Sequence, residues 1–336
     1  MSTIPKTHLV SGFETTGSYD VIKTLEVETP QITSPTDIII KNKYAGVNFI
    51  DGYFRMGVYP SANKPHIFGR EGSGVVTAVG DAVTKYKVGD NVAYMSPNAF
   101  AQHVKLPEDY IQILKLKNEA SESDFKIYGG ALLQSLTALT FITEAHEVKK
   151  DEFILVWAAA GGVGSILVQL ASQRGAKVIA IASTTDKLEK AKELGAEYVI
   201  NYKTEDVVAR VKDITGGKGV AASFNSVGKS SFESSFESLA RKGTLVSFGN
   251  ASGVVPPFAI NRLSAKNITL LRPQVFGYIT EESEWKHYST ILREELDSGK
   301  LKFEISKVYP LKDYSQAAKD LESGATTGKL VIEIPQ

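Results

Sequence analysis

Cysteine is absent from all 336 residues of the chain. Its absence excludes disulfide bonds, thiolate zinc sites, iron–sulfur clusters and cysteine nucleophiles. An excess of charge is also missing, because 38 basic residues balance 38 acidic ones. Such a chain has no global field that would attract nucleic acid or an anionic membrane. The remaining composition, with 43% hydrophobic residues, is that of a globular protein, and its length predicts two domains.

Long apolar runs and a leader segment are lacking too. No run approaches the roughly 20 apolar residues that span a bilayer. The first ten residues, MSTIPKTHLV, do not join a basic flank to an apolar stretch as a secretory signal does. We therefore expect a cytoplasmic protein, with a nuclear fraction as an alternative, and no membrane partner.

Two kinds of pattern divide the chain. Residues 1–131 hold short β-branched runs between turn residues, such as 38–40, 73–77 and 91–94, which predicts a mostly antiparallel β domain. In residues 132–272, apolar strands alternate with helical stripes, and strands are predicted at 153–157, 178–182, 198–200, 220–224, 244–249 and 268–271. This alternation predicts an α/β fold with a doubly wound parallel sheet. Residues 273–336 end in a strand-like stretch and are expected to pack back onto the first domain.

A glycine turn follows the first predicted strand of the parallel sheet. Residues 159–164 read AAGGVG, which matches G-x-G-x-x-G with alanine in the first place. Small residues allow a tight turn and a close approach of the backbone to a pyrophosphate, while the helix N-terminus offers N–H groups to phosphates. A buried strand precedes the turn and an amphipathic helix follows it. The sequence therefore predicts a dinucleotide on Ala160, Gly161, Gly162, Val163 and Gly164.

The end of the second strand bears on the choice between NADH and NADPH. An NAD enzyme usually carries an acid about 20 residues after the glycines to bind the ribose 2′-hydroxyl, but this chain has Ser183 and Thr184 there. These hydroxyls, the cation of Lys187 and the phenol of Tyr202 suit a 2′-phosphate, so NADPH is predicted. Lys187 taken alone is better explained as a solvated helix residue. The missing acid is the observation that favours NADPH over NADH. Asp186, with Glu189 three residues on, is expected to cap the following helix.

Several motifs occur in a familiar order along the chain. They are AGVNFID at 45–51, RMGVYP at 55–60, GREGSG at 69–74, VGD at 88–90, the glycine turn, SFGN at 247–250 and Gly328-Lys329. Together they resemble the zeta-crystallin type of quinone oxidoreductase, a zinc-free branch of the medium-chain dehydrogenase/reductase superfamily, and most closely its fungal members. The resemblance implies a GroES-like domain, a Rossmann domain and an active cleft between them. It also implies NADPH-dependent reduction of quinones and a homodimer joined through the Rossmann sheets.

The same resemblance bears on metal binding. Zinc-dependent members of the superfamily place a cysteine where this chain has Asn48, and a His-Glu pair where it has Arg70-Glu71. Asparagine is a poor zinc ligand and arginine cannot be one. The five histidines, His8, His66, His103, His146 and His287, are scattered, and we interpret them as ordinary surface or core residues. We therefore expect no metal.

The resemblance further implies which residues form the acceptor site. Asn48, Tyr53 and Tyr59 would line it, and Asn48 and Tyr53 would also contact the cofactor. An amide or phenol can donate a hydrogen bond to a developing oxyanion, and a tyrosine ring can stack on a flat acceptor. By residue type alone, each of the three is more simply explained as a packing or turn residue. No single residue is assigned as an obligate acid, because water can protonate the product.

Further cofactor contacts follow from the resemblance or from strand ends. They are Thr137, Ser226, Phe248, Gly249, Asn250, Ala251, Arg272, Pro273 and Gln274. Three positions depart from the family pattern. Gly324 stands where bacterial relatives have an arginine that reaches the 2′-phosphate, Asn225 replaces a common aspartate, and Thr140 stands where some relatives have a tyrosine.

Three functions stay open at this point. The first is reduction of a quinone, by transfer of a hydride or of single electrons. The second keeps NADPH and reduces the C=C bond of a 2-alkenal or enone. The third is RNA binding as a secondary role, against which the zero net charge and the lack of a Lys/Arg-rich run both argue.

Overall fold

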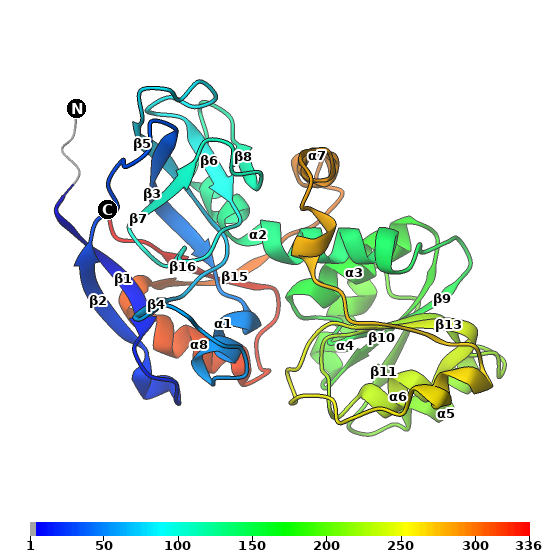
Figure 1. Cartoon of the computed structure of the whole chain (residues 1–336). Coiled ribbons are helices and arrows are strands. Elements are labelled where there is room, and N and C mark those ends of the chain that lie inside the picture. The colour runs from blue at the N-terminus through cyan, green and yellow to red at the C-terminus, as the bar shows by residue number, and fades with distance from the viewer. Residues whose placement is uncertain (1–4) are drawn as a thin grey trace. The chain divides into compact units, whose positions relative to one another are not determined.

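The computed structural model describes residues 5–336, which form two compact units (Figure 1). Unit 1 comprises the described residues up to Leu133 together with Phe303–Gln336, and unit 2 comprises Gln134–Lys302. The chain was expected to return to the first domain from residue 273, but residues 273–302 belong to unit 2. The Lys302 N–H donates to Gln169 Oε1 at 2.8 Å, and the Tyr288 hydroxyl donates to Glu144, so both contacts fasten this segment to unit 2.

Unit 1 is built on a seven-stranded sheet with the order β15-β16-β3-β5-β6-β8, where β7 also pairs with β3. A second sheet has the order β2-β1-β4. The strands are β1 (Thr7–Phe13), β2 (Lys23–Glu28), β3 (Asp37–Gly46), β4 (His66–Ile67), β5 (Gly72–Val79), β6 (Asn91–Tyr94), β7 (His103–Pro107), β8 (Ile113–Lys115), β15 (Ile305–Pro310) and β16 (Lys329–Glu333). The three predicted runs lie in β3, β5 and β6, and Ile38, Ile40, Val76 and Val92 belong to the buried core.

The C-terminal strand completes the main sheet of unit 1. β16 pairs antiparallel with β3, where Val331 lies opposite Gly46, and parallel with β15. A second link joins the tail to the N-terminal part, because Arg55 forms an ion pair with Glu322 at 2.8 Å. The predicted strand at 329–334 therefore supplies the neighbour that the apolar strand β3 needs on that side.

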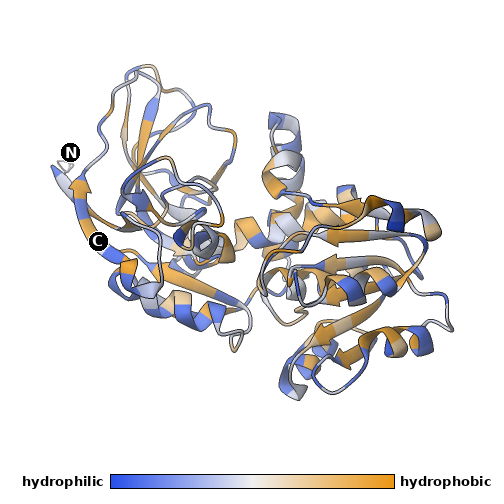
Figure 2. Ribbon diagram, turned by 60° about the horizontal axis from the view of Figure 1, so that its bottom comes forward, coloured by the Kyte–Doolittle hydropathy of each residue, from blue (hydrophilic) through white to orange (hydrophobic). Residues whose placement is uncertain are grey.

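Unit 2 contains a six-stranded sheet in the order β11-β10-β9-β12-β13-β14. All its pairs are parallel, which confirms the predicted doubly wound sheet. The strands are β9 (Phe153–Trp157), β10 (Lys177–Ala182), β11 (Tyr198–Asn201), β12 (Val220–Asn225), β13 (Leu239–Ser247) and β14 (Thr269–Leu271). Figure 2 shows these strands as mostly hydrophobic, as expected for strands with both faces covered.

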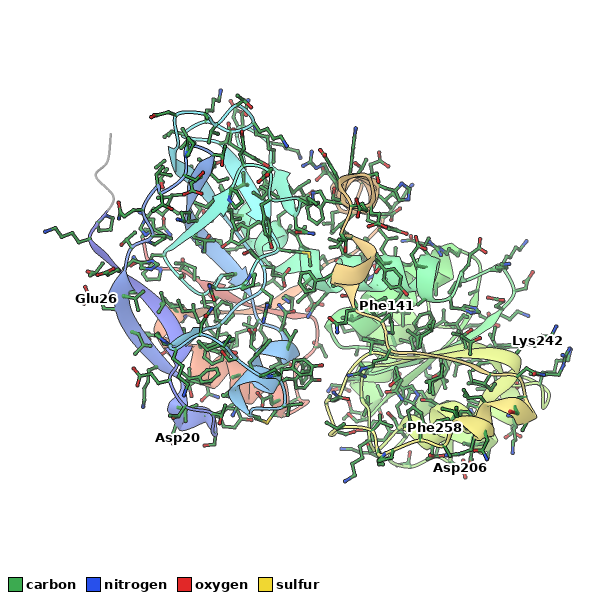
Figure 3. All side chains as sticks on the ribbon, viewed as in Figure 1. Asp20, Glu26, Phe141, Asp206, Lys242 and Phe258 are labelled. Carbon is green, nitrogen blue, oxygen red and sulfur yellow. The ribbon has the colours of Figure 1, made fainter. Side chains whose placement is uncertain are left out.

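Eight α-helices accompany the strands in residues 5–336. They are α1 (Phe49–Arg55), α2 (Glu122–Thr140), α3 (Gly162–Gln173), α4 (Thr185–Glu193), α5 (Val207–Ile214), α6 (Phe232–Glu237), α7 (Glu282–Asp297) and α8 (Tyr314–Glu322). Asp206, labelled in Figure 3, caps α5 by accepting from the Ala209 N–H at 3.0 Å. The predicted cap of α4 at Asp186 is wrong. Thr184 has the extended backbone of a cap and accepts from the Lys187 N–H, while Asp186 lies in the first turn.

α2 is a long and largely apolar helix. With the π-helical turn Phe141–Ala145 it forms a 24-residue stretch that is long and apolar enough to cross a membrane, and 78% of its most apolar window is buried within the protein. Core helices pass the same test, and this burial is typical of a core helix. The division between the units falls within α2, between Leu133 and Gln134.

The Arg55–Glu322 pair predicts how strongly unit 1 depends on its tail. Only 3% of the Arg55 side chain is exposed, so Glu322→Ala leaves a buried guanidinium without its counter-charge. We expect a loss of about 3 kcal/mol in the free energy of unfolding, measured by urea titration. Glu233→Ala is the matched control, because its partner Arg262 is 39% exposed and the cost should stay below about 1 kcal/mol. Equal losses in both variants would contradict the argument.

Candidate active site

The glycine turn of unit 2 connects β9 to α3. The Gly161 N–H donates to the Ala158 carbonyl at 2.8 Å and closes the turn, while Ala158 itself has a positive φ of 51°. A Cβ on Gly164 would lie 2.2 Å from the Ala158 oxygen, so only glycine fits there. The first turn of α3 then offers its N–H groups to an anion. This cradle fits the pyrophosphate of a dinucleotide.

Gln134 is a neighbour of the turn that the sequence analysis missed. Its side-chain amide fills the space beside Gly162, where a Cβ would lie 2.2 Å from Oε1. Gln134 Oε1 is buried and has no hydrogen-bond partner among residues 5–336. Gln134 lies on α2, 27 residues before Gly161, and no local motif marks it. An unpaired acceptor at the cradle is suited to a hydroxyl or amide of a bound nucleotide.

The ends of β10 and β11 bring the predicted 2′-phosphate residues together. Ala182 lies opposite Asn201, and the Tyr202 N–H donates to the Ala182 carbonyl at 3.3 Å. Ser183 and Thr184 therefore lie beside Tyr202, which is exposed and has its ring centroid 6.2 Å from that of Trp157. The Thr184 hydroxyl also caps α4 by accepting from the Lys187 N–H, and its O–H is not used by that bond.

Lys203 adds a second cation at this position. Burial lowers the pKa of Lys187, and the charge of Lys203 lowers it further. Two cations that repel each other are suited to a dianionic group between them. Lys187 was predicted from the sequence and Lys203 was not, although Lys203 directly follows the predicted phenol of Tyr202.

The remaining cofactor candidates of unit 2 gather at the ends of β12, β13 and β14. A Cβ on Gly249 would lie 2.1 Å from the Ser226 carbonyl, so these two loops are in close contact. Arg272 Nη1 donates to the carbonyls of Ser247 and Gly249 at 3.0 and 3.1 Å, which fastens the segment that continues through Pro273 and Gln274. The guanidinium of Arg272 therefore orders the crevice at the ends of these strands.

The end of α2 reaches the same crevice. The ring of Phe141, labelled in Figure 3, contacts the ring of Phe248 with centroids 5.2 Å apart. Thr137 lies one turn earlier on α2, and the Ala251 N–H donates to Ser226 at 3.4 Å, next to Asn250. The structure thus brings Thr137, Ser226 and the 248–251 loop to one edge of the parallel sheet, which is where ligands bind in such folds.

Two of the three departures from the family pattern have structural roles in unit 2. Asn225 is buried and its Oδ1 accepts from the N–H groups of Val227 and Gly228, so it holds the turn after β12. The Thr140 hydroxyl donates to the Leu136 carbonyl inside its own helix. Gly324 follows α8 in unit 1 with a positive φ of 67°.

The acceptor candidates of unit 1 surround α1. The rings of Tyr53 and Tyr59 meet edge to face with centroids 5.4 Å apart, and the Tyr59 N–H donates to the Tyr53 carbonyl at 3.1 Å. Tyr53 is buried and Tyr59 is half-buried. Phe49, Met56 and Val58, between 38% and 48% exposed, form an apolar surface around them. A flat apolar acceptor fits such a surface.

Asn48 belongs to a buried polar network that the sequence did not reveal. Its Nδ2 donates to Glu71 Oε1 at 2.9 Å and to the Gly46 carbonyl at 3.0 Å. Its Oδ1 accepts from Lys329 Nζ at 2.7 Å, and Lys329 also forms an ion pair with Glu71 at 2.8 Å. Both amide hydrogens are therefore taken, so the expected hydrogen bond from Asn48 to an oxyanion does not fit this arrangement.

Asp51 and Arg70 lie beside this network. Burial raises the pKa of Asp51 to about 6, although the Gly69 N–H donates to its Oδ1 at 2.9 Å and Arg70 and Lys329 favour its charge. Its Oδ2 is buried and has no hydrogen-bond partner among residues 5–336. Asp51 is thus a carboxyl group whose charge the fold disfavours.

The histidines include a buried pair. The His103 N–H donates to His8 Nδ1 at 3.1 Å, and burial lowers the pKa of His8 to about 4. Residues 5–336 contain no group of three His, Cys, Asp or Glu side chains placed to hold a metal ion.

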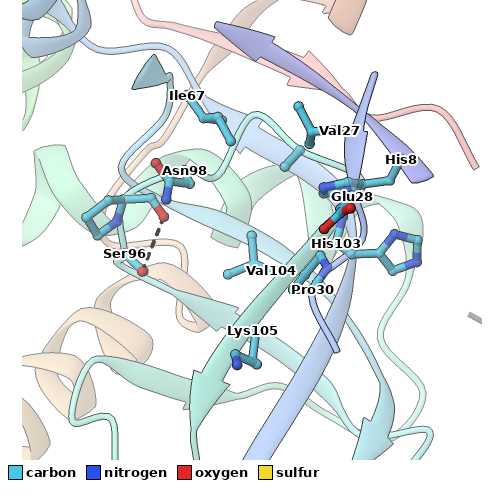
Figure 4. A pocket seen from close by; sticks show the side chains of 12 residues that line it. His8, Val27, Glu28, Pro30, Ile67, Ser96, Asn98, His103, Val104 and Lys105 are labelled. Carbon is cyan, nitrogen blue, oxygen red and sulfur yellow. Dashed lines mark hydrogen bonds between the residues drawn. The ribbon is translucent and has the colours of Figure 1, made fainter. Parts of the chain in front are cut away.

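His8 and His103 line a pocket of about 370 Å³ in unit 1, with Glu28 and Asn98 (Figure 4). No residue of the two candidate sites lines this pocket.

Lys187→Ala should weaken discrimination between NADPH and NADH. Loss of one charged contact to a 2′-phosphate should reduce the ratio of the two affinities about tenfold, since a charged hydrogen bond contributes about 1.5–3 kcal/mol. The measurement is the Kd of each nucleotide by titration calorimetry. Lys192→Ala, exposed on the same helix, is the control and should leave the ratio unchanged. An unchanged ratio in Lys187→Ala would remove this residue from the site.

Asp51→Asn should flatten the dependence of stability on pH. The folded-state pKa near 6 lies above the unfolded value near 4, so folding binds a proton, and this contribution is full below about pH 4 and lost as pH rises through 6. In urea titrations between pH 4 and 7, the free energy of unfolding of the wild type should fall by roughly 3 kcal/mol relative to that of Asp51→Asn. Asp81→Asn, in an exposed turn, should keep the wild-type pH dependence. Parallel pH dependences of the wild type and Asp51→Asn would refute the assignment.

Comparison with known proteins agrees with both units. Residues 34–117 match the alcohol dehydrogenase GroES-like domain, and residues 162–294 match the zinc-binding dehydrogenase domain. The chain is 42% identical to a probable quinone oxidoreductase of Schizosaccharomyces pombe over 94% of both chains. It is 33% identical to a 2-haloacrylate reductase of Burkholderia, over 90% of this chain and 92% of that one.

A solved structure supports the same conclusion. Escherichia coli quinone oxidoreductase, in complex with NADPH, matches with a TM-score of 0.91 and 37% identity over 97% of this chain and 99% of that one. The GroES-like and parallel-sheet units, the glycine cradle and these likenesses agree with the resemblance that the motifs indicated. The chain belongs to the quinone oxidoreductase family of the medium-chain dehydrogenase/reductase superfamily.

Proposed function

We propose that the protein is an NADPH-dependent reductase of quinones, with the nucleotide held by unit 2 and the acceptor met by unit 1. The observation that carries the cofactor choice is the end of β10, where Ser183 and Thr184 stand in place of an acid and lie beside Tyr202, with Lys187 in the first turn of α4. The NADPH complex of the Escherichia coli relative supports this choice.

The residues of the chain have a limited task in this reaction. NADPH, when bound, supplies the electrons, as a hydride or singly. The glycine cradle and the crevice fastened by Arg272 orient the nucleotide. The rings of Tyr53 and Tyr59 and the apolar surface of Phe49 exclude water and stack on a flat acceptor. Since the hydrogens of Asn48 are taken, donation to the developing oxyanion is left to the phenols, and water can complete protonation.

Reduction of an activated C=C bond is the second candidate. The likeness to 2-haloacrylate reductase, whose solved structure matches with a TM-score of 0.83 and 31% identity, favours it. Both reactions need NADPH, a phenolic donor and an apolar surface, so the same residues serve either acceptor. The exposed apolar side chains of Phe49, Met56 and Val58 favour a quinone over a short alkenal.

Assembly and location complete the proposal. β14 pairs with β13 and forms the last strand of its sheet, so its outer edge can pair with a second copy, and we expect a homodimer joined through unit 2. We place the protein in the cytoplasm, with a nuclear fraction as an alternative. RNA binding would be a secondary role, and the balanced charge gives it little electrostatic support.

The test is NADPH oxidation against a panel of ortho-quinones, para-quinones, short 2-alkenals and 2-haloacrylate. We expect kcat/KM for quinones to exceed that for the alkenals by about tenfold or more. A chelator should leave all rates unchanged. Faster turnover of the alkenals or of 2-haloacrylate would replace the proposal by the second candidate. Oxidation of NADPH with no member of the panel would refute both.

A further inference from the structure

Lys329 and Glu71 form an ion pair in the interior of unit 1. Their side chains are 1% and 0% exposed, with Nζ and Oε1 2.8 Å apart. Removing two charges from water costs several kcal/mol per ion, so such a pair is weak evidence for stability and calls for another role. Glu71 Oε2 accepts from the Leu133 N–H of α2 at 2.8 Å, which leaves both carboxylate oxygens bonded.

The backbone beside the ion pair carries glycine at two positions, where a larger residue would collide with it. A Cβ on Gly46 would lie 2.3 Å from Glu71 Oε1 and 2.9 Å from Lys329 Cε. A Cβ on Gly130 of α2 would lie 3.3 Å from Lys329 Cγ. Glycine at both positions opens the space that the lysine and the carboxylate occupy. The sequence is thus adapted to this buried cation at several points.

The network fixes which end of the Asn48 amide faces which neighbour. Lys329 Nζ can only donate, so the atom facing it is Oδ1. Glu71 Oε1 and the Gly46 carbonyl can only accept, so the atom facing them is Nδ2. An asparagine amide turned by 180° exchanges Oδ1 and Nδ2 with almost no change in shape. Lys329 and Glu71 allow only one of these two orientations. One lone pair of Oδ1 is the hydrogen-bonding capacity that Asn48 retains.

We propose that Lys329 is a positioning residue that turns Asn48 into a hydrogen-bond acceptor for a bound molecule, so that the group meeting Asn48 is an O–H or N–H donor. This inference rests on the proposed function for the location of Asn48 at the reaction site. A quinone offers carbonyl acceptors only, so the quinone is not the partner of this atom. Two sources of donors remain, namely the carboxamide and ribose hydroxyls of the nicotinamide half of NADPH, and the hydroxyl of the hydroquinone product.

The test compares Lys329→Met with the wild type in nucleotide binding without any acceptor. The Kd values of NADPH and of 2′,5′-ADP, which lacks the nicotinamide half, are measured by titration calorimetry. If the donor belongs to the nucleotide, Lys329→Met should weaken NADPH about tenfold or more and leave 2′,5′-ADP within about twofold. Lys329→Arg keeps a donor to Asn48 and should recover part of the loss. Lys307→Met, an exposed ion-pair lysine on the adjacent strand, is the control and should change neither value.

A second arm distinguishes the product as the source of the donor. Inhibition by a simple hydroquinone is measured in the quinone assay for the same variants. Unchanged NADPH affinity with a hydroquinone Ki raised about tenfold would assign the donor to the product. Unchanged values in both arms would overturn the proposal. So would loss of 2′,5′-ADP binding in proportion to NADPH, since that result indicates a structural role alone.

Folding is controlled by a second variant. Lys329→Met/Glu71→Gln leaves no unpaired buried charge, and it replaces the single variant if the latter does not fold. The expected ratios are the same for both. Failure of the wild type to reduce any quinone would refute the proposed function. The Kd values of NADPH and 2′,5′-ADP would still test the role of Lys329, because they need no acceptor.

Discussion

The ion pair between Lys329 and Glu71 is the interaction on which the organisation of unit 1 depends. Through it the last strand, β16, is joined to the residue before β5, to the N-terminus of α1 at Asn48 and to α2 at Leu133. Four segments that are distant in the sequence therefore share one buried charge pair. A lysine at this position is shielded from water, and burying its charge without a partner would be costly. The C-terminal tail therefore packs where Lys329 can pair with Glu71.

Much of the fold could be predicted because its signals are local. Apolar strands, helical stripes and the glycine turn each lie within a few residues, and the six-stranded parallel sheet followed from their order. The return of the tail was placed too early because its attachment is not local. Residues 273–302 stay with unit 2 through contacts such as the Gln169–Lys302 bond, which spans 133 residues and leaves no local trace.

The residues of the candidate site also divide into those with a local sequence signal and those placed by contacts between distant segments. Ser183 and Thr184 could be chosen from sequence because they directly follow the end of β10, and Lys187 because it lies just after them in the first turn of α4. Gln134 and Lys203 were missed, since what they face is set by chain pairing and not by their own neighbours. Asn48 was chosen by resemblance, and its expected chemistry was that of a donor. The two residues that reverse it lie 23 and 281 positions away.

The charge at this place has a consequence for the choice of acceptor. By resemblance, zinc-dependent relatives have metal-site residues at the positions of Asn48 and Glu71, and here the same two side chains hold an ammonium. The carboxylate of Glu71 balances the charge of this ammonium, which has no open coordination position with which to polarise a substrate oxygen. A substrate that needs strong polarisation would gain little from it. A quinone, whose carbonyls are already electrophilic and whose reduced form is aromatic, needs only to be oriented beside the nicotinamide. The buried lysine therefore matches the acceptor that the family relatives suggest.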